Sequence, residues 1–161
     1  MFKGGTSLSK VWKVIHRFSE DIDLAIDPSI WGFEGDLTKK QIKRLRKASS
    51  IFVRDEFCHS LQEAVSETGM EKWLQVEADP GGEGDGTYPE PRMIYICYKS
   101  LFDEDLPYLH SEVKLEVSAR SLLEPTAEAA VTSILEDALP ISTTVKQVMI
   151  CLLYTSDAAD E

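Results

Sequence analysis

The feature that most constrains the fold of this chain is a Gly-Gly pair followed, after a short apolar-striped segment, by two aspartates one residue apart. In an extended strand, successive side chains alternate between two faces. Asp21 and Asp23 therefore point the same way, while Ile22 and Leu24 point into the core. Two carboxylates on one face suit Mg²⁺, which completes its coordination with water and substrate phosphates. Since like charges repel unless a cation or proton compensates, the pair favours a metal-bound nucleotide substrate over a bare strand edge.

The glycines provide the second half of this motif. Gly4 and Gly5 allow the backbone to approach a ligand closely, and Thr6 and Ser7 are predicted to start a helix whose free N–H groups favour a phosphate. The helix is expected to run from Ser7 to about Arg17. Its apolar stripe consists of Leu8, Val11, Trp12 and Ile15. Each half taken alone is also compatible with a plain turn and a solvated strand edge.

Together the two segments resemble a known family. The strings Phe2-Lys3-Gly4-Gly5-Thr6-Ser7-Leu8-Ser9-Lys10 and Arg17-Phe18-Ser19-Glu20-Asp21-Ile22-Asp23-Leu24 are similar to the polymerase-β-type nucleotidyltransferases. Within that superfamily the two strings together resemble the AbiEii/AbiGii branch, the toxin half of type IV toxin–antitoxin systems. It is clear over residues 2–26 and fainter over residues 113–120. It implies an α/β (α+β) nucleotidyltransferase core with a mixed sheet flanked by helices, Mg²⁺ as cofactor, a nucleoside triphosphate as substrate and a cognate antitoxin as partner.

The resemblance also assigns roles to residues. Such enzymes take a third carboxylate from a neighbouring strand, which implies Glu116 here, although an exposed Glu–Lys face explains that residue almost as well. Arg120 follows as a candidate phosphate contact. The expected catalytic residues are Asp21, Asp23, Glu116 and Ser19, the first three of them metal ligands. The expected nucleotide-binding residues are Lys3, Gly4, Gly5, Thr6, Ser7 and Lys10.

A long basic helix is predicted in the middle of the chain. Thr38 and Gln41 have capping-box spacing, and helical periodicity continues to Thr68-Gly69, either unbroken or with one break. Cations near a helix N-terminus oppose its dipole, so a basic cluster there suggests a polyanionic partner such as an RNA acceptor. A solvated face paired with acidic surface elsewhere is an equal alternative. The basic cluster consists of Lys39, Lys40, Lys43, Arg44, Arg46 and Lys47.

The rest of the sheet can also be read from the sequence. Residues 73–77 alternate as a strand, residues 92–99 form a strand apolar on both faces and hence central, and residues 113–118 alternate cleanly. The glycine-rich segment 79–86 carries acids and lacks the Gly-Lys-Ser/Thr ending of a phosphate loop. We expect it to be a plain hairpin or connection.

Composition limits the remaining possibilities. The net charge of −11 argues against a surface that binds nucleic acid throughout, and no apolar run reaches membrane-span length, which favours a cytoplasmic protein. Three scattered cysteines fit neither a disulfide framework nor a zinc site, and Cys58 and Cys97 are expected to be small buried residues. Residues 1–150 are expected to be a partial nucleotidyltransferase domain lacking upstream sequence. Residues 151–161 resemble a translated sequencing adapter.

Two rival functions remain open. A small-molecule nucleotidyltransferase, such as an antibiotic-modifying enzyme, would use the same core with a pocket for its acceptor. A non-catalytic fragment would only bind nucleotide or a partner protein. The basic cluster favours a nucleic-acid acceptor over a small one, and the complete Asp-x-Asp pattern favours an enzyme over a bare binder.

Overall fold

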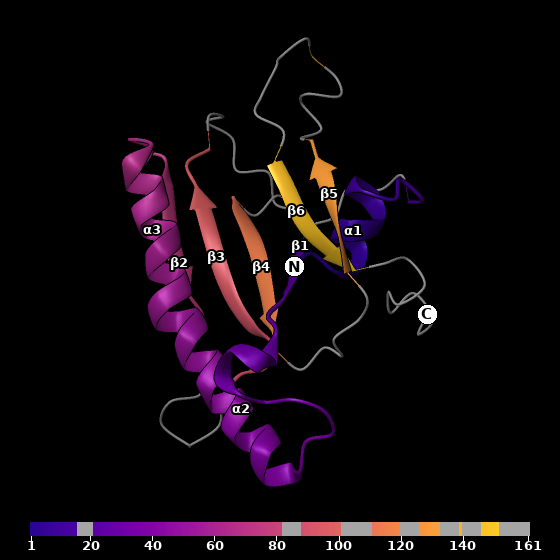
Figure 1. The fold of residues 1–161 in the computed structure, drawn as a ribbon. Helices are drawn as coiled ribbons and strands as arrows, with labels where there is room; N and C mark the ends of the chain where they lie inside the picture. The colour runs from indigo at the N-terminus through magenta and orange to yellow at the C-terminus, as the bar shows by residue number, and fades with distance from the viewer. Residues whose placement is uncertain are drawn as a thin grey trace.

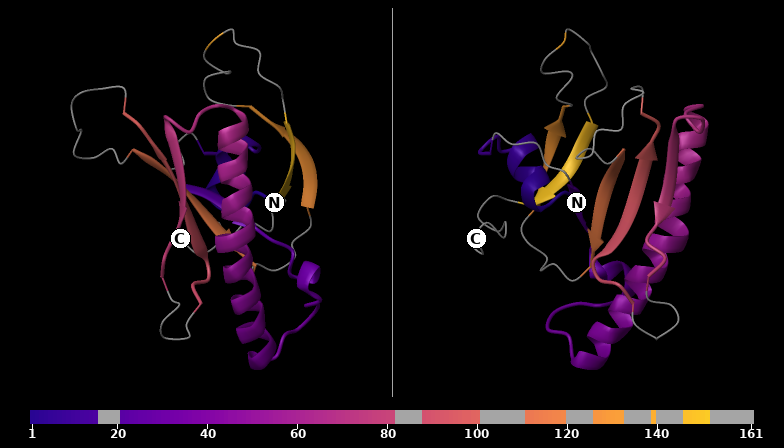
Figure 2. Two further views of the ribbon diagram at one scale, coloured as in Figure 1. Left: turned by 90° about the vertical axis from the view of Figure 1, so that its left-hand side faces the viewer. Right: turned by 180° about the vertical axis from the view of Figure 1, so that it is seen from behind.

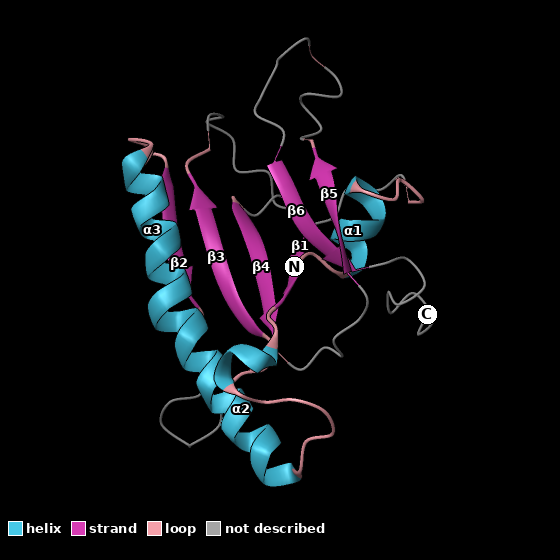
Figure 3. Ribbon diagram, viewed as in Figure 1, coloured by secondary structure: helices cyan, strands magenta, loops and turns pink. Residues whose placement is uncertain are grey.

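The structure is a computed structural model that describes residues 1–15, 21–81, 88–100, 111–119, 126–132, 139 and 146–151. All the described helical segments lie in the first half of the chain, with β1 after the first of them, and five strands follow, which gives a mixed α/β architecture (Figure 1, Figure 3). The helical segments are α1 (Gly4–Lys10), the 3-10 turn η1 (Pro28–Trp31), α2 (Lys39–Phe52), the π-helical segment η2 (Val53–Phe57) and α3 (Cys58–Glu67). The strands are β1 (Asp21–Ala25), β2 (Leu74–Ala78), β3 (Arg92–Tyr98), β4 (Glu112–Ser118), β5 (Thr126–Val131) and β6 (Lys146–Cys151).

Four strands form one mixed sheet in the order β1-β4-β3-β2. β1 runs parallel to β4, whereas β3 pairs antiparallel with both β4 and β2. The predictions of a mixed sheet, of a central strand over residues 92–99 and of a hairpin connection after β2 are confirmed. The glycines at positions 82, 84 and 86 lie outside the described residues.

The long helix starts where the sequence predicts. Thr38 and Gln41 form a reciprocal capping box, which satisfies free backbone N–H groups of the first turn. The helix continues through a π-helical break at η2 and stops at Thr68, just before Gly69 with φ +69°. Figure 2 shows this helix running across one face of the sheet.

Strand alternation divides the sheet into two different faces. On the helix-covered face, Val76, Ile94, Leu115 and Val117 join Val53 of the long helix in a buried core. Ile22 and Leu24 pack against this core, as the sequence predicts. The opposite face carries Asp21, Asp23 and Glu116 and is called the open face below.

The long helix and the turn that follows it contact the backbone of β2 at the outer edge of the sheet. Gln62 donates a hydrogen bond to the carbonyl of Val76 (2.9 Å), and the Leu74 amide donates to the carbonyl of Met70 (2.9 Å). The Ala78 backbone bonds the sulfur of Cys58. An edge covered in this way offers few free backbone groups to another chain.

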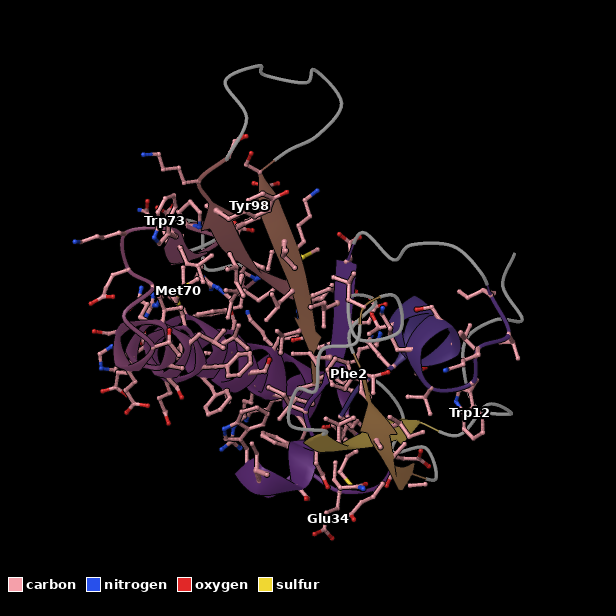
Figure 4. All side chains as sticks on the ribbon, turned by 90° about the horizontal axis from the view of Figure 1, so that it is seen from above. Phe2, Trp12, Glu34, Met70, Trp73 and Tyr98 are labelled. Atoms are coloured by element: carbon pink, nitrogen blue, oxygen red, sulfur yellow. The ribbon has the colours of Figure 1, made fainter. Side chains whose placement is uncertain are left out.

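The N-terminal residues connect the sheet to a two-stranded ribbon. The amide of Lys3 donates to Asp23 O (3.1 Å) and the amide of Ala25 donates to Met1 O (2.9 Å), so residues 1–3 run antiparallel to β1. On its other side Phe2 bridges to Ile150 of β6, which pairs with β5. Figure 4 shows Phe2 between the sheet and this ribbon.

Two local predictions are wrong. The helix after the glycines begins at Gly4 and ends at Lys10, instead of running from Ser7 to Arg17. The β-branched residues that follow have low helix propensity, and Lys13 has φ +53°, which no helix accommodates. Cys58 is buried as expected, but Cys97 is only half-buried because its position on β3 faces the open side.

Two charged residues in the contact between α2 and the sheet, half-buried Glu90 and buried Arg92, were not predicted. The Glu90 carboxylate accepts hydrogen bonds from Ser49 of α2 (2.7 Å), Ser118 of β4 (2.7 Å) and the Ala119 amide (2.8 Å). Arg92, 2% exposed, donates to Ser50 (2.6 Å) and to the carbonyl of Asp79. These bonds connect α2 to the sheet. Within the described ranges, no helix is long and apolar enough to cross a membrane.

Candidate active site

The three predicted carboxylates lie on adjacent strands of the open face. Asp23 of β1 is directly opposite Glu116 of β4 in the parallel register, and Asp21 is opposite Lys114. Directly paired side chains on one face are neighbours, about 5 Å apart at Cβ. The strand pairing therefore brings Glu116 beside the Asp-x-Asp pair, as the resemblance implies.

Helix α1 packs against Asp23 through its two glycines. Gly4 has φ +54°, and a Cβ at this position would lie 2.6 Å from Asp23 Oδ2. The Gly5 backbone forms a hydrogen bond with the Asp23 carboxylate. Gly4 is thus required both by its backbone conformation and by the close approach of the carboxylate.

Thr6 and Ser7 are buried parts of this arrangement. The Thr6 hydroxyl donates to the carbonyl of Asp21 (3.0 Å) and accepts from the amide of Asp23 (3.4 Å), which connects α1 to the strand on both sides of Ile22. The Ser7 hydroxyl donates to the carbonyl of Gly4 (2.9 Å). Both side chains therefore hold the glycine turn in place, a role that the sequence did not reveal.

Electrostatic interactions and burial shift the pKa values of Asp23 and Glu116. Burial raises the pKa of Asp23, and the charge of Asp21 raises it further, while Lys3 opposes the shift. Burial likewise raises the pKa of Glu116, with contributions in the same direction from Asp23 and Asp21. The three acids and Lys3 thus form one electrostatic cluster in which a bound cation would relieve repulsion.

The donor chemistry of this cluster fits magnesium. Within the part of the chain that the structure describes, no three His, Cys, Asp or Glu side chains are close enough together to hold a metal ion between them. Mg²⁺ does not need such a group of three, since one or two carboxylates together with water and substrate phosphates suffice. Asp23 and Glu116 are partly buried carboxylates whose pKa is raised by burial and by the charges of neighbouring acids, so they are suitable ligands for a cation.

The remaining predicted site residues are placed as follows. Lys3 lies beside Asp23 on the neighbouring N-terminal segment and acts on both Asp23 and Glu116. Lys10 lies at the end of α1 opposite to the glycines. Ser19 and Arg120 fall outside the described residues.

The basic cluster lies on the helix-covered side, away from the carboxylates. Arg46 donates to the carbonyl of Tyr88 (2.9 Å), and Lys47 lies 5.7 Å from the centre of the Tyr88 ring. The other four, Lys39, Lys40, Lys43 and Arg44, are exposed and form no ion pair with any described carboxylate. The structure thus separates the two features, the carboxylates and the basic cluster, that the sequence analysis assigned to one reaction.

Comparison with known proteins bears on this site. Neither the curated proteins nor the solved structures compared with the chain include a match. A family model described as the nucleotidyl transferase AbiEii toxin of type IV toxin–antitoxin systems matches residues 1–151, which include both glycines and all three carboxylates. The chain therefore belongs to the AbiEii family of nucleotidyltransferase toxins.

Proposed function

We propose that this chain transfers a nucleotidyl group from a nucleoside triphosphate to RNA, with Asp21, Asp23 and Glu116 holding magnesium. The observation that carries the proposal is the register that places Asp23 beside Glu116 on the open face. Magnesium would neutralise charge on the transferring phosphoryl group and orient its oxygens. Burial and the charges of neighbouring acids raise the pKa of Asp23 and of Glu116, which supports this role because a bound cation would offset both effects.

The triphosphate is proposed to bind along the start of α1. Lys3 offers positive charge next to Asp23, and the absence of a Cβ at Gly4 lets the Asp23 carboxylate lie close to the start of α1. Thr6 and Ser7 act indirectly, by holding the turn, and Lys10 adds charge at the far end of the helix. Ser19 stays a predicted neighbour, two residues before Asp21.

The proposed reaction is a single displacement. An acceptor hydroxyl oxygen bonds to the α-phosphorus, the bond from that phosphorus to the bridging oxygen of the β-phosphate breaks, and pyrophosphate leaves. The hydroxyl proton passes to solvent. The protein contributes position and charge, which dominate catalysis of phosphoryl-type transfers.

The partners follow from the basic cluster and from the family. Lys39, Lys40, Lys43 and Arg44 are exposed cations without described acidic partners, which suits an RNA backbone. Because these residues lie on the helix side, an RNA that contacts both them and the carboxylates must pass around an end of the sheet. Membership of a toxin–antitoxin family supports a cognate antitoxin as a protein partner. The proposed substrates occur in the cytoplasm, which is therefore the proposed location of the protein.

The test is labelled-nucleotide transfer by the full chain. Each α-labelled nucleoside triphosphate is incubated with total RNA and magnesium, and incorporation into RNA is expected. Asp21→Asn, Asp23→Asn and Glu116→Gln are each expected to abolish it, and EDTA is expected to do the same. Glu112→Gln, on the same face and strand as Glu116 but separated from it by Lys114, is the matched control and should retain transfer.

Calorimetric binding of the magnesium nucleotide tests the site independently of turnover. Loss of this binding in Asp23→Asn but not in Glu112→Gln is expected. Full transfer or full nucleotide binding in both aspartate variants would refute the metal assignment. Label appearing on small amines or alcohols instead of RNA would favour the small-molecule enzyme, and binding without any transfer would favour the non-catalytic fragment.

A further inference from the structure

The open face continues beyond the carboxylates as a cross-strand row. Asp21 of β1 is opposite Lys114 of β4, Lys114 is opposite Tyr95 of β3, and Tyr95 is opposite Glu77 of β2. Lys114 and Tyr95 are half-buried, and no described carboxylate forms an ion pair with Lys114. The row thus places an available cation and an aromatic ring beside the proposed catalytic site.

The position of α1 determines from which side an acceptor can approach. Asp23 contacts Gly4 and Gly5, so α1 and Lys3 occupy the open face on the β1 side of the carboxylates. Figure 4 shows α2 and α3 together on the other side of the sheet, with no described helix over β3 and β4 on the open face. In-line displacement requires the attacking oxygen and the leaving pyrophosphate on opposite sides of the phosphorus. With the triphosphate along α1, the acceptor must approach over β4 and β3.

We infer that Lys114 and Tyr95 position the terminal nucleotide of the RNA acceptor, an inference that rests on the proposed transfer reaction. Strands are spaced about 4.8 Å apart, so Tyr95 lies about 10 Å from Asp21, a span suited to one nucleotide. The Tyr95 ring stacks on the terminal base, and Lys114 pairs with its phosphate. The ribose hydroxyl then reaches the carboxylates.

Acidic residues limit this surface to one nucleotide. Glu77 ends the row at the sheet edge, and Glu112 is the next outward-facing residue on β4 before Lys114. A second phosphate lying along the row would meet these carboxylates without a compensating cation among the described residues of the open face. Only the terminal nucleotide of the acceptor therefore contacts the sheet, and the rest of the RNA backbone turns away from it. This favours a chain end over an internal segment as the acceptor.

Binding of a short RNA tests the inference without turnover. The probe is a fluorescein-labelled twelve-nucleotide oligoadenylate, titrated into the full chain with magnesium and a non-hydrolysable nucleotide analogue. Tyr95→Ala is expected to weaken binding about tenfold, whereas Tyr95→Phe keeps the ring and the affinity. Lys114→Gln is expected to reduce the magnitude of the salt slope by about 0.7, whereas Lys114→Arg keeps it. Tyr98→Ala, on the opposite face of β3 and 41% exposed, is the matched control without effect.

Crosslinking locates the bound end. An oligonucleotide with 4-thiouridine at its 3′ terminus should crosslink to the β3 peptide, and one with 4-thiouridine at its 5′ terminus should not. Equal crosslinking from both ends, or unchanged RNA affinity in Tyr95→Ala, would overturn the inference, as would weakened binding of the nucleotide alone in that variant. These readouts stand even where Asp23→Asn retains transfer, so failure of the inference and failure of the proposed reaction are distinguishable.

Discussion

The two faces of the four-stranded sheet are made by the same strands and serve opposite purposes. On β4, Leu115 and Val117 are buried under the long helix, whereas Glu116 between them faces Asp23 on the open side. Burial of apolar area on the first face stabilises the folded protein. The second contains carboxylates whose raised pKa values indicate that their charges are unfavourably placed in the folded protein. Stability and chemistry are thus separated residue by residue along one strand.

The largest expected effect comes from breaking the covered face. Ile94 is fully buried, so Ile94→Ala should lower the free energy of unfolding by about 2 to 5 kcal/mol, through lost transfer energy and the cavity left behind. The matched change is Met93→Ala, on the adjacent residue of β3 but on the open face, with an expected loss of about 1 kcal/mol. Urea unfolding measures both. Equal losses would show that both faces are packed alike.

The second effect tests the glycine at the boundary of the open face. Gly4→Ala should lower stability by about 1 to 2 kcal/mol, the cost of a left-handed backbone conformation for a residue with a Cβ. It should also abolish binding of magnesium nucleotide, because the new Cβ displaces the Asp23 carboxylate.

Gly32→Ala is the control for this change. Gly32 has φ +73° but no atom within 4 Å of an added Cβ, so the same backbone strain arises without a neighbouring carboxylate. A similar loss of stability with unchanged nucleotide binding is expected. Loss of binding in both variants would attribute the effect to instability alone.

The covered face could be predicted from the sequence better than the open one. Period-two alternation in residues 113–118 and the capping box at Thr38 are local signals, and both correspond to observed elements. The adjacency of Asp23 and Glu116 depends on pairing between distant strands, which residue pattern alone does not determine. It was expected only through the family resemblance. The contacts of half-buried Glu90 and buried Arg92 left no sequence signal, because their hydrogen-bond partners are supplied by the fold.

The third effect is smaller and concerns charge on the open face. Because the pKa of Asp23 is raised in the folded state, the ionised group opposes folding at neutral pH, and its contribution is favourable only when it is protonated. In EDTA at pH 7, Asp23→Asn should therefore raise the free energy of unfolding. The gain should disappear as the pH falls through the raised pKa and below the ordinary value of 3.8.

Asp27→Asn should show the opposite sign. Hydrogen bonds from Ser29 lower the pKa of Asp27, so the ionised group stabilises the fold above the ordinary carboxyl pKa. Its replacement should lower stability at neutral pH, with the loss disappearing as the pH falls through the lowered pKa. Chemical denaturation between pH 3 and pH 8 compares the two. A loss of stability in Asp23→Asn at neutral pH would contradict the assignment of electrostatic cost to the open face.

The smallest expected effect comes from the basic residues of α2, and it tests whether the covered side of the sheet also binds RNA. Lys39, Lys40 and Lys43 are exposed on the first turns of α2, where their charges oppose the helix dipole. Replacing all three with Gln should stabilise the fold by about 0.5 to 1 kcal/mol. If they contact RNA, the magnitude of the salt slope of RNA binding should also fall by about 2, since each single-strand contact contributes about 0.7.

Nucleotide binding should be unchanged, because the carboxylates lie on the opposite face. Filter binding across salt concentrations measures the slope. An unchanged slope with lowered stability would assign these lysines to internal charge pairing, and the acceptor would then be bound by the open face alone.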